Sequence, residues 1–198
     1  MRESFQSFSL FGPSGHRKYL NPAERKRFID AANGAPPETR LFCLTLGWSG
    51  ARISEALALT PAAIDVECGV CLRTLKQRRR GVFRQVPLPP HLLEQLDSYF
   101  DLSSARRNPE LAGERIWRWS RTTAWRHVKA LMASAGVVGT AAMPKGLRHS
   151  FGVNAVQSKV PLPIIQRWLG HSKIETTAIY LDVMGPEERA LAARMWNR

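Results

Sequence analysis

Two short stretches place basic residues where a helix is predicted to begin. In ARISEALALT, Arg52 follows a glycine break, and Glu55 lies three positions later on the same helix face. In PKGLRHSFG, Pro144 suits a helix start, and Lys145 and Arg148 are one turn apart. A guanidinium steered by a carboxylate can offer two parallel donors to a phosphate, and a helix N-terminus adds positive field. The alternative for Arg52 and Glu55 is an exposed ion pair, which contributes little to stability.

The cations of the second stretch are in conflict with their own helix. Lys145 and Arg148 oppose the helix dipole, so they destabilise the helix unless they meet an anion. A local conflict of this kind is typical of functional sites. This placement therefore hints that the two residues belong to an anion-binding site.

A third stretch, PIIQRWLGHSKIETTAIYL, carries His171 directly after Gly170 and Tyr180 nine positions later. Gly170 is predicted to end one helix. By residue type alone, the histidine could be a cap and the tyrosine a core residue with a satisfied hydroxyl. A tyrosine can also act as a nucleophile, although a weak one at its usual pKa of ~10.

The composition indicates the class of partner. The chain has 198 residues, a formal net charge of +13 and a pI near 10.6, and a field of that sign attracts nucleic acid first of all. Ribosomal and membrane-surface proteins would share this charge. No stretch approaches the roughly 20 apolar residues of a membrane span, and no signal peptide is evident.

The cysteines argue against a disulfide framework and against a metal site. Their number is three, and the pair Cys68 and Cys71 has no second Cys or His pair at zinc-finger distance. The simpler interpretation places both near a hairpin turn. We therefore expect a soluble protein of a reducing cytoplasm, associated with DNA or the nucleoid and not with a membrane, and no metal.

The elements that must position these motifs are mostly helices. Helical periodicity and end signals predict helices over 22–33, 36–50, 51–60, 90–100, 120–136, 145–158, 161–169, 173–181 and 185–196. Between them, 63–88 alternates apolar and polar residues in short runs, which predicts an antiparallel meander of two or three strands. The predicted fold is mainly α with a small antiparallel β-sheet (α+β). It comprises a flexible lead-in over 1–20, a domain over 21–184 and a C-terminal helix over 185–198.

Taken together, the motifs carry a family resemblance. R-I-S-E-A-L-A-L, L-R-H-S-F and L-G-H-S-x-I-x-T-T-x-I-Y, in this order and spacing, resemble the catalytic domain of the tyrosine recombinases, the phage integrase family. The resemblance runs from about residue 20 to about residue 185. It implies a site-specific recombinase or integrase of a mobile element, in which a tyrosine attacks a DNA phosphodiester. That attack forms a 3′-phosphotyrosyl link and frees a 5′-hydroxyl, without a metal or nucleotide cofactor.

The resemblance also assigns roles to the residues that carry it. Arg52 and Arg148 would clamp the phosphate, and His171 would donate to the same oxygens. Tyr180 would be the nucleophile, and Glu55 would hold Arg52 in place. Such a site suits a transition state that gathers negative charge on phosphorus oxygens.

Two lysines complete the predicted catalytic set. The family's general acid lies on a turn between two strands, where Lys76 stands in TLKQRRRG. The family pattern H-x-x-R appears here as Lys145-x-x-Arg148, and some members share this lysine. Lys145 can donate to the phosphate, but it is a poorer base than histidine at neutral pH unless its surroundings depress its pKa. His149 is expected to be structural.

The expected partner is double-stranded DNA, met by two basic segments. RIWRWSRTTAWRHVK interleaves tryptophans with cations, although Trp117, Trp119 and Trp125 equally fit core packing at helical spacing. The DNA-contacting residues would be Arg78, Arg79, Arg80, Arg118, Arg121, Arg126 and Lys129. Most of these cations would touch phosphates and carry little sequence information.

The length bears on assembly and on the alternatives. The 20 or so residues before the domain are too few for the separate DNA-clamping domain of most family members, so we expect a catalytic domain alone. The 185–198 helix is expected to dock on a neighbouring copy, giving a synaptic dimer or tetramer on DNA. Two other functions stay open, namely a non-catalytic DNA-binding regulator on this fold and a DNA-relaxing enzyme of the type IB topoisomerase kind.

Overall fold

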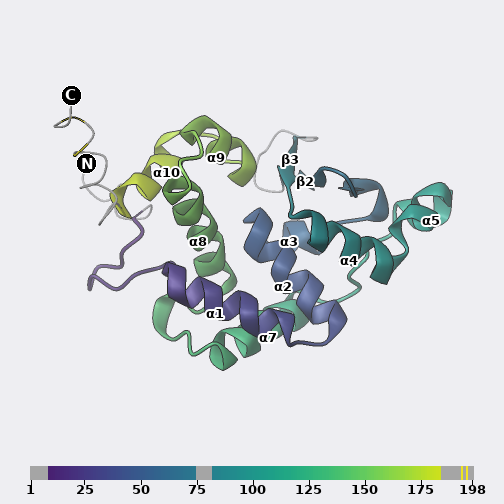
Figure 1. The fold of residues 1–198 in the computed structure, drawn as a ribbon, viewed down its shortest axis with the longest axis horizontal. Helices are drawn as coiled ribbons and strands as arrows, with labels where there is room; N and C mark the ends of the chain where they lie inside the picture. Colours follow the sequence, from purple (N-terminus) through teal and green to yellow (C-terminus); the bar gives the residue numbers. More distant parts are fainter. Residues whose placement is uncertain (1–8, 75–81, 184–192, 194, 196–198) are drawn as a thin grey trace.

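The described residues fold as packed helices with a small sheet at one side (Figure 1). The computed structural model describes residues 9–74, 82–183, 193 and 195. The α-helices are α1 (Pro22–Asn33), α2 (Pro37–Ser49), α3 (Ile53–Ala56), α4 (Pro90–Phe100), α5 (Leu102–Arg107), α6 (Pro109–Ala112), α7 (Arg121–Ser134), α8 (Pro144–Gln157), α9 (Leu162–Leu169) and α10 (Glu175–Ala178). The described residues also form the short 3₁₀ helices η2 (Pro61–Ala63), η3 (Gly139–Ala141) and η4 (Ile179–Val183). The predicted class, mainly α with a small antiparallel sheet, is confirmed.

The predicted meander is a three-stranded antiparallel sheet. Strands β1 (Ile64–Asp65), β2 (Gly69–Arg73) and β3 (Phe83–Pro87) follow one another in the order β1-β2-β3. The first turn requires glycine, because Gly69 has a φ of 146° and a Cβ there would lie 2.2 Å from the Val86 carbonyl oxygen. On β3 the alternation places Arg84 and Val86 on the buried face. An arginine at an inward position of a strand is unusual and becomes important at the site.

Helix ends follow the predicted signals where they matter for the site. Helix α2 ends at Gly50 with a φ of 61°, and α9 ends at Gly170 with a φ of 64°. A Cβ on Gly50 would come within 2.5 Å of the Phe151 ring of α8. The end of α2 and the middle of α8 therefore pack without a gap, which brings the first two motifs together.

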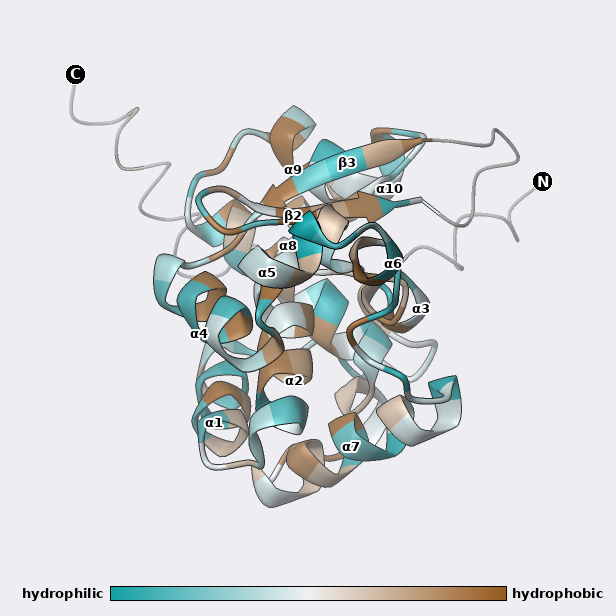
Figure 2. Cartoon of the chain, turned by 90° about the vertical axis from the view of Figure 1, so that its right-hand side faces the viewer, coloured by the Kyte–Doolittle hydropathy of each residue, from teal (hydrophilic) through white to brown (hydrophobic). Residues whose placement is uncertain are grey.

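The core lies around α2 and α8. Figure 2 shows apolar residues along α2, which packs against α1, α3, α4, α7 and α8. Leu41, Phe42 and Leu46 on α2 and Leu147 on α8 are buried in one cluster. Because α8 carries Arg148 between such apolar positions, burial of the helix also fixes that arginine.

Three segments differ from the predicted elements. Residues 9–20 are packed and not a free lead-in, since Leu10, Tyr19 and Leu20 are buried and Phe11 pairs with Arg17 in an isolated bridge. Helix α3 is one turn long instead of spanning 51–60, and α5 and α6 lie where no helix was predicted. Within the described part of the chain, no helix has the length and apolarity needed to cross a lipid bilayer.

Candidate active site

Arg52 and Glu55 form a closed unit at the start of α3. The Arg52 Nη1 donates to Glu55 Oε1 at 2.6 Å, and the Arg52 backbone N donates to Glu55 Oε2 at 2.9 Å. The Glu55 side chain is fully buried, whereas 28% of the Arg52 side chain is exposed. The pair is thus no exposed surface pair, because the carboxylate is buried and holds a guanidinium that still faces solvent.

The Glu55 carboxylate is shared among three arginines. Arg84 Nη2 donates to Glu55 Oε2 at 2.6 Å, and Arg148 Nη1 lies 3.9 Å from the same oxygen. Burial would raise the pKa of Glu55, but the hydrogen bond and charge of Arg84, together with Arg52, hold it below its usual range. Three cations around one anion leave an excess of positive charge that suits a phosphate.

Arg148 projects from α8 into this cluster and is itself buried. Its Nη1 donates to the Gly50 carbonyl at 2.6 Å, and its Nη2 donates to the Leu169 carbonyl. The arginine therefore ties the end of α2 to the end of α9. Burial, reinforced by the charge of Arg52, lowers the pKa of Arg148 to about 9, so the group remains a cation at neutral pH.

His171 and Tyr180 complete the cluster from the C-terminal side. His171 Nδ1 lies 3.0 Å from Thr177 Oγ1, and its ring lies nearly parallel to that of Tyr180, with centroids 6.3 Å apart and an interplanar angle of 14°. Tyr180 sits in η4 against Gly152 of α8, where a Cβ would approach its ring to 2.5 Å. The tyrosine is only 1% exposed. Burial raises its pKa to about 12 despite the opposing charges of Arg148 and Arg52.

His149 contacts the tyrosine hydroxyl, which the sequence did not reveal. Its Nδ1 lies 3.1 Å from Tyr180 Oη. Burial, followed by the charges of Lys145 and Arg148, lowers the pKa of His149 to about 4. A neutral imidazole at physiological pH can accept the hydrogen bond of the phenol. The only signal in the sequence was the position of His149 next to Arg148.

Lys145 lies on the exposed surface at the first turn of α8, one turn before His149. Lys76, Arg78, Arg79 and Arg80 lie outside the described residues. On either side of these residues, the Thr74 backbone N donates to the Val82 carbonyl at 2.8 Å.

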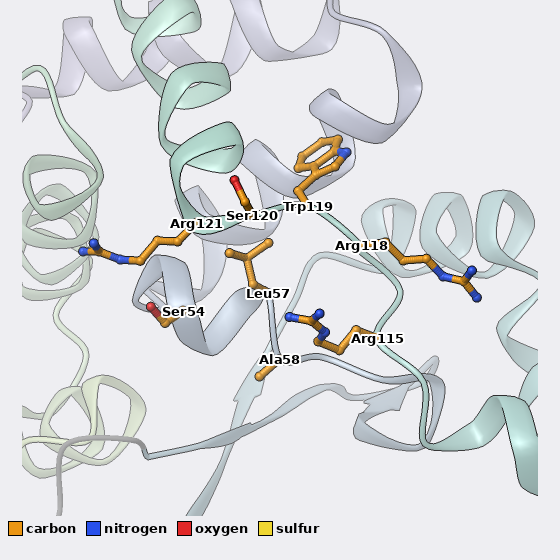
Figure 3. Close-up of a pocket in the computed structure, with 8 residues that line it drawn as sticks. All are labelled: Ser54, Leu57, Ala58, Arg115, Arg118, Trp119, Ser120 and Arg121. Carbon is orange, nitrogen blue, oxygen red and sulfur yellow. The ribbon is translucent and has the colours of Figure 1, made fainter.

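The basic residues of the 115–129 segment fall into two groups. Arg115, Arg118, Trp119, Ser120 and Arg121 line a shallow pocket with residues of α3 and of the turn that follows it (Figure 3). Arg118, Arg121 and Arg126 are exposed, and Arg118 pairs with Glu114 at 2.5 Å. Lys129 instead donates to the Ala142 carbonyl at 2.8 Å, so one of its hydrogen bonds holds the fold.

The three tryptophans of that segment have different roles. Trp117 is fully buried, and its ring meets the edge of Phe42 with centroids 5.1 Å apart, so it belongs to the core. Trp119 is partly buried against the same core. Trp125 is 44% exposed and can face a ligand. Core packing therefore holds for Trp117 and in part for Trp119, while the exposed Trp125 is available to a nucleic acid.

Among the described residues, no group of three or more His, Cys, Asp or Glu is arranged to hold a metal ion. Cys43 is buried, and burial raises its pKa to about 12, so that thiol is a core group. Cys68 and Cys71 are exposed at the β1–β2 turn and on β2.

Comparison with known proteins assigns the family. The sequence model described as "Phage integrase family" matches residues 18–185, and the chain belongs to that family. It is 31% identical over 176 residues to tyrosine recombinase XerA of Pyrococcus furiosus, covering 84% of this chain and 57% of that protein. It is 30% identical over 154 residues to tyrosine recombinase XerD of Pseudomonas aeruginosa, covering 73% of this chain and 49% of that protein.

Solved structures share the fold. A crystal structure of XerA recombinase has a TM-score of 0.71 at 24% identity, over 89% of this chain and 64% of the other. The catalytic domain of bacteriophage HP1 integrase has a TM-score of 0.63 at 20% identity, over 89% of this chain and 93% of the other. The chain thus spans somewhat more than half the length of XerA of Pyrococcus furiosus and nearly all of an isolated catalytic domain.

The two half-buried histidines of the site give the protein a pH-dependent stability. His149 and His171 have their pKa values lowered to about 4 and about 3, mainly by burial, from an ordinary 6.5. The unfolded chain therefore binds more protons below pH 6.5, and the folded state loses stability as the pH falls from 6.5 toward 4. Each histidine contributes at most about 1.4 kcal/mol per pH unit.

Urea unfolding at several pH values between 7 and 5 checks this expectation. His149→Gln should flatten the dependence of the unfolding free energy on pH, whereas His91→Gln, at an exposed position on α4, should leave it unchanged. A slope in the His149→Gln variant equal to that of the parent would contradict the assignment.

Proposed function

We propose that this chain is the catalytic part of a site-specific recombinase that cuts and rejoins DNA strands through a 3′-phosphotyrosyl intermediate. The observation that carries the proposal is that Arg52 and Arg148 meet at one buried carboxylate, and that His171 and Tyr180, whose rings lie side by side, are close enough to feel the charge of both arginines. Four separate segments supply these groups, and the positive charge they hold in excess lies next to a tyrosine. Membership of the family supports the same reaction.

In the proposed reaction the Tyr180 oxygen attacks the phosphorus, and the bond from phosphorus to the 5′ oxygen breaks. Arg52 and Arg148 stabilise the negative charge on the non-bridging oxygens, and Lys76 protonates the leaving 5′ oxygen. His171 donates from Nε2 to the same oxygens. This role requires the tautomer in which Nε2 carries the proton and Nδ1 accepts from the Thr177 hydroxyl. The phenol must lose its proton during attack, because a pKa of about 12 keeps Tyr180 neutral beforehand. His149 Nδ1, which lies 3.1 Å from Tyr180 Oη, takes up that proton.

A direct test uses DNA without assuming a recombination site. Duplexes bound by the protein are selected from a random-sequence pool and rebuilt with a nick, so that the short cleaved fragment diffuses away and the covalent product accumulates. A protein–DNA adduct on a denaturing gel is the expected result. Binding without an adduct would favour a non-catalytic regulator. Relaxation of supercoiled plasmid that lacks the selected sequence would favour a topoisomerase-like enzyme.

Lys145 is proposed to donate to the bound phosphate from the exposed first turn of α8. Lys145→Ala is expected to lower the cleavage rate measurably while leaving activity, because Arg148 still holds the phosphate. Lys145→His should stay active, since histidine also offers a donor there. Cleavage time courses on the nicked duplex measure both. A rate for Lys145→Ala equal to the parent would return this residue to ordinary surface charge.

The DNA surface is proposed to include the exposed arginines of the shallow pocket that α3, the turn after it and residues 115–121 form (Figure 3). Binding to one site should be weak and salt-dependent, with log affinity falling against log salt by ~0.9 for each phosphate neutralised. Arg121→Gln should weaken binding and reduce that slope by about one such contact. Arg107→Gln, the same charge change on α5, is the matched control. Equal slopes for the parent and Arg121→Gln in fluorescence titrations would remove this residue from the interface.

Self-association on DNA is proposed through the C-terminal helix predicted over 185–198. Of that segment, the structure describes residues 193 and 195 alone, and Met195 is 71% exposed. We also propose that the protein works on DNA in the nucleoid of a reducing cytoplasm. A solved structure with a similar fold, XerH site-specific recombinase bound to palindromic difH substrate, is a post-cleavage complex, which supports DNA as the partner.

A further inference from the structure

Arg84 is a buried arginine that neither motif spacing nor the predicted reaction uses. It lies on the inward face of β3, and its side chain is 3% exposed. A buried guanidinium is strongly destabilising unless its donors and its charge are satisfied. The partners that satisfy the Arg84 guanidinium therefore indicate what this residue does in the site.

The Arg84 guanidinium joins three parts of the site. Its Nη2 donates to Glu55 Oε2 at 2.6 Å, its Nη1 to Thr74 Oγ1 at 3.1 Å, and its Nε to the Trp168 carbonyl at 2.7 Å. These partners lie on α3, at the end of β2 and on α9. A planar fork with five N–H donors can make these three contacts at once, which the single ammonium of a lysine cannot reproduce.

The loop that carries His171 also rests on this side chain. A Cβ on Gly170 would lie 3.1 Å from Arg84 Cδ and Nη1. Glycine is therefore favoured at position 170 for two reasons: the residue ends α9 in a left-handed conformation, and the Arg84 guanidinium approaches it closely. The backbone just before His171 is in this way fixed by both a hydrogen bond and a packing contact from Arg84.

We propose that Arg84 is a positioning residue that sets the arrangement of the phosphate-binding arginines through Glu55. The proposal rests on the proposed function. With Arg84 on Oε2 and Arg52 on Oε1, the carboxylate is held from two sides and keeps Arg52 in one orientation. Glu55 Oε2 accepts from Arg84 at 2.6 Å and from the Arg52 backbone N at 2.9 Å, while Arg148 Nη1 donates to the Gly50 carbonyl and lies 3.9 Å from that oxygen. Arg84 thus keeps the carboxylate from drawing Arg148 away from the phosphate.

The test compares Arg84→Lys with Arg25→Lys in the full chain, using the nicked duplex obtained by selection. Arg25 is a buried arginine of α1 that stacks on Trp48 at 4.4 Å and donates to the Gly47 carbonyl, so its replacement controls for loss of buried guanidinium packing. At saturating DNA, Arg84→Lys should lower the cleavage rate between about tenfold and about 100-fold, the size of effect expected when reacting groups are misplaced. DNA affinity should change little, and Arg25→Lys should cleave at the parental rate.

A double-mutant cycle of Arg84→Lys with Glu55→Gln, measured on the cleavage rate, separates positioning from a purely structural role. If Arg84 acts through Glu55, the double variant should be no slower than Glu55→Gln alone, because the route of action is already lost. A parental saturating rate for Arg84→Lys, or rate losses that simply multiply in the double variant, would overturn the proposal. Absence of an adduct with the parent protein would instead refute the proposed function.

Folding of the variants is followed by urea unfolding. Should Arg84→Lys show no cooperative transition, Thr74→Val takes its place, since it removes one anchor of the guanidinium and retains the charge. The proposal then requires a lower saturating rate with unchanged DNA affinity. A parental rate for Thr74→Val in that case overturns it.

Discussion

Tyr180→Phe is expected to bind DNA like the parent and to form no covalent protein–DNA adduct. The hydroxyl is the atom that would join to phosphorus, and no step of the proposed reaction proceeds without it. The ring itself should stay in place, because it packs against Gly152 and beside His171. Among the described residues, His149 is the group that loses a hydrogen-bond partner, and this loss costs about 1 kcal/mol of unfolding free energy.

Denaturing gels of the nicked duplex measure this loss, and a filter-binding titration on the same duplex measures affinity. Tyr19→Phe is the matched control, because Tyr19 is likewise a buried tyrosine but lies in the segment before α1. It should form adduct at the parental level. An adduct that persists in Tyr180→Phe would assign the nucleophile to another residue.

Arg52→Ala is expected to lower the cleavage rate at saturating DNA by about 10²–10³-fold, the effect of removing one donor that meets developing negative charge. Affinity should fall much less, since many phosphate contacts contribute to binding. Arg52 is a cleaner probe than Arg148. Replacing Arg148 by alanine also strips two buried backbone carbonyls, of Gly50 and Leu169, of their donor, so that loss of stability mixes with loss of rate.

The chain offers a matched control for Arg52. Arg17 is also held by a glutamate of a helix first turn, with Nη1 donating to Glu24 Oε2 at 2.7 Å, and its side chain is 36% exposed. Arg17→Ala removes the same kind of pair away from the cluster and should cleave at the parental rate. If Arg52→Ala instead abolishes binding while the saturating rate stays normal, Arg52 is only a phosphate anchor.

Several features of this protein are set by local sequence. The ends of α2 and α9 follow from Gly50 and Gly170, which take left-handed conformations that other residues adopt at a cost. The start of α8 follows from Pro144, and the meander follows from alternation broken by Gly69. These are short-range effects, so periodicity and turn chemistry were enough to predict them. The grouping of the arginines, the histidine and the tyrosine as one predicted set came from the family resemblance that the motifs carry, and not from local patterns.

Other features were decided by contacts between distant segments. Arg84 looks like one more cation of a basic run until α3, the end of β2 and α9 supply its partners. His149 contacts the Tyr180 hydroxyl because η4 places that hydroxyl beside the histidine ring. Trp117 is buried against Phe42 of α2, whereas Trp125 is exposed. The spacing of the tryptophans alone did not predict this difference. Long-range packing determines which polar group is desolvated and beside what, and that is information no local pattern contains.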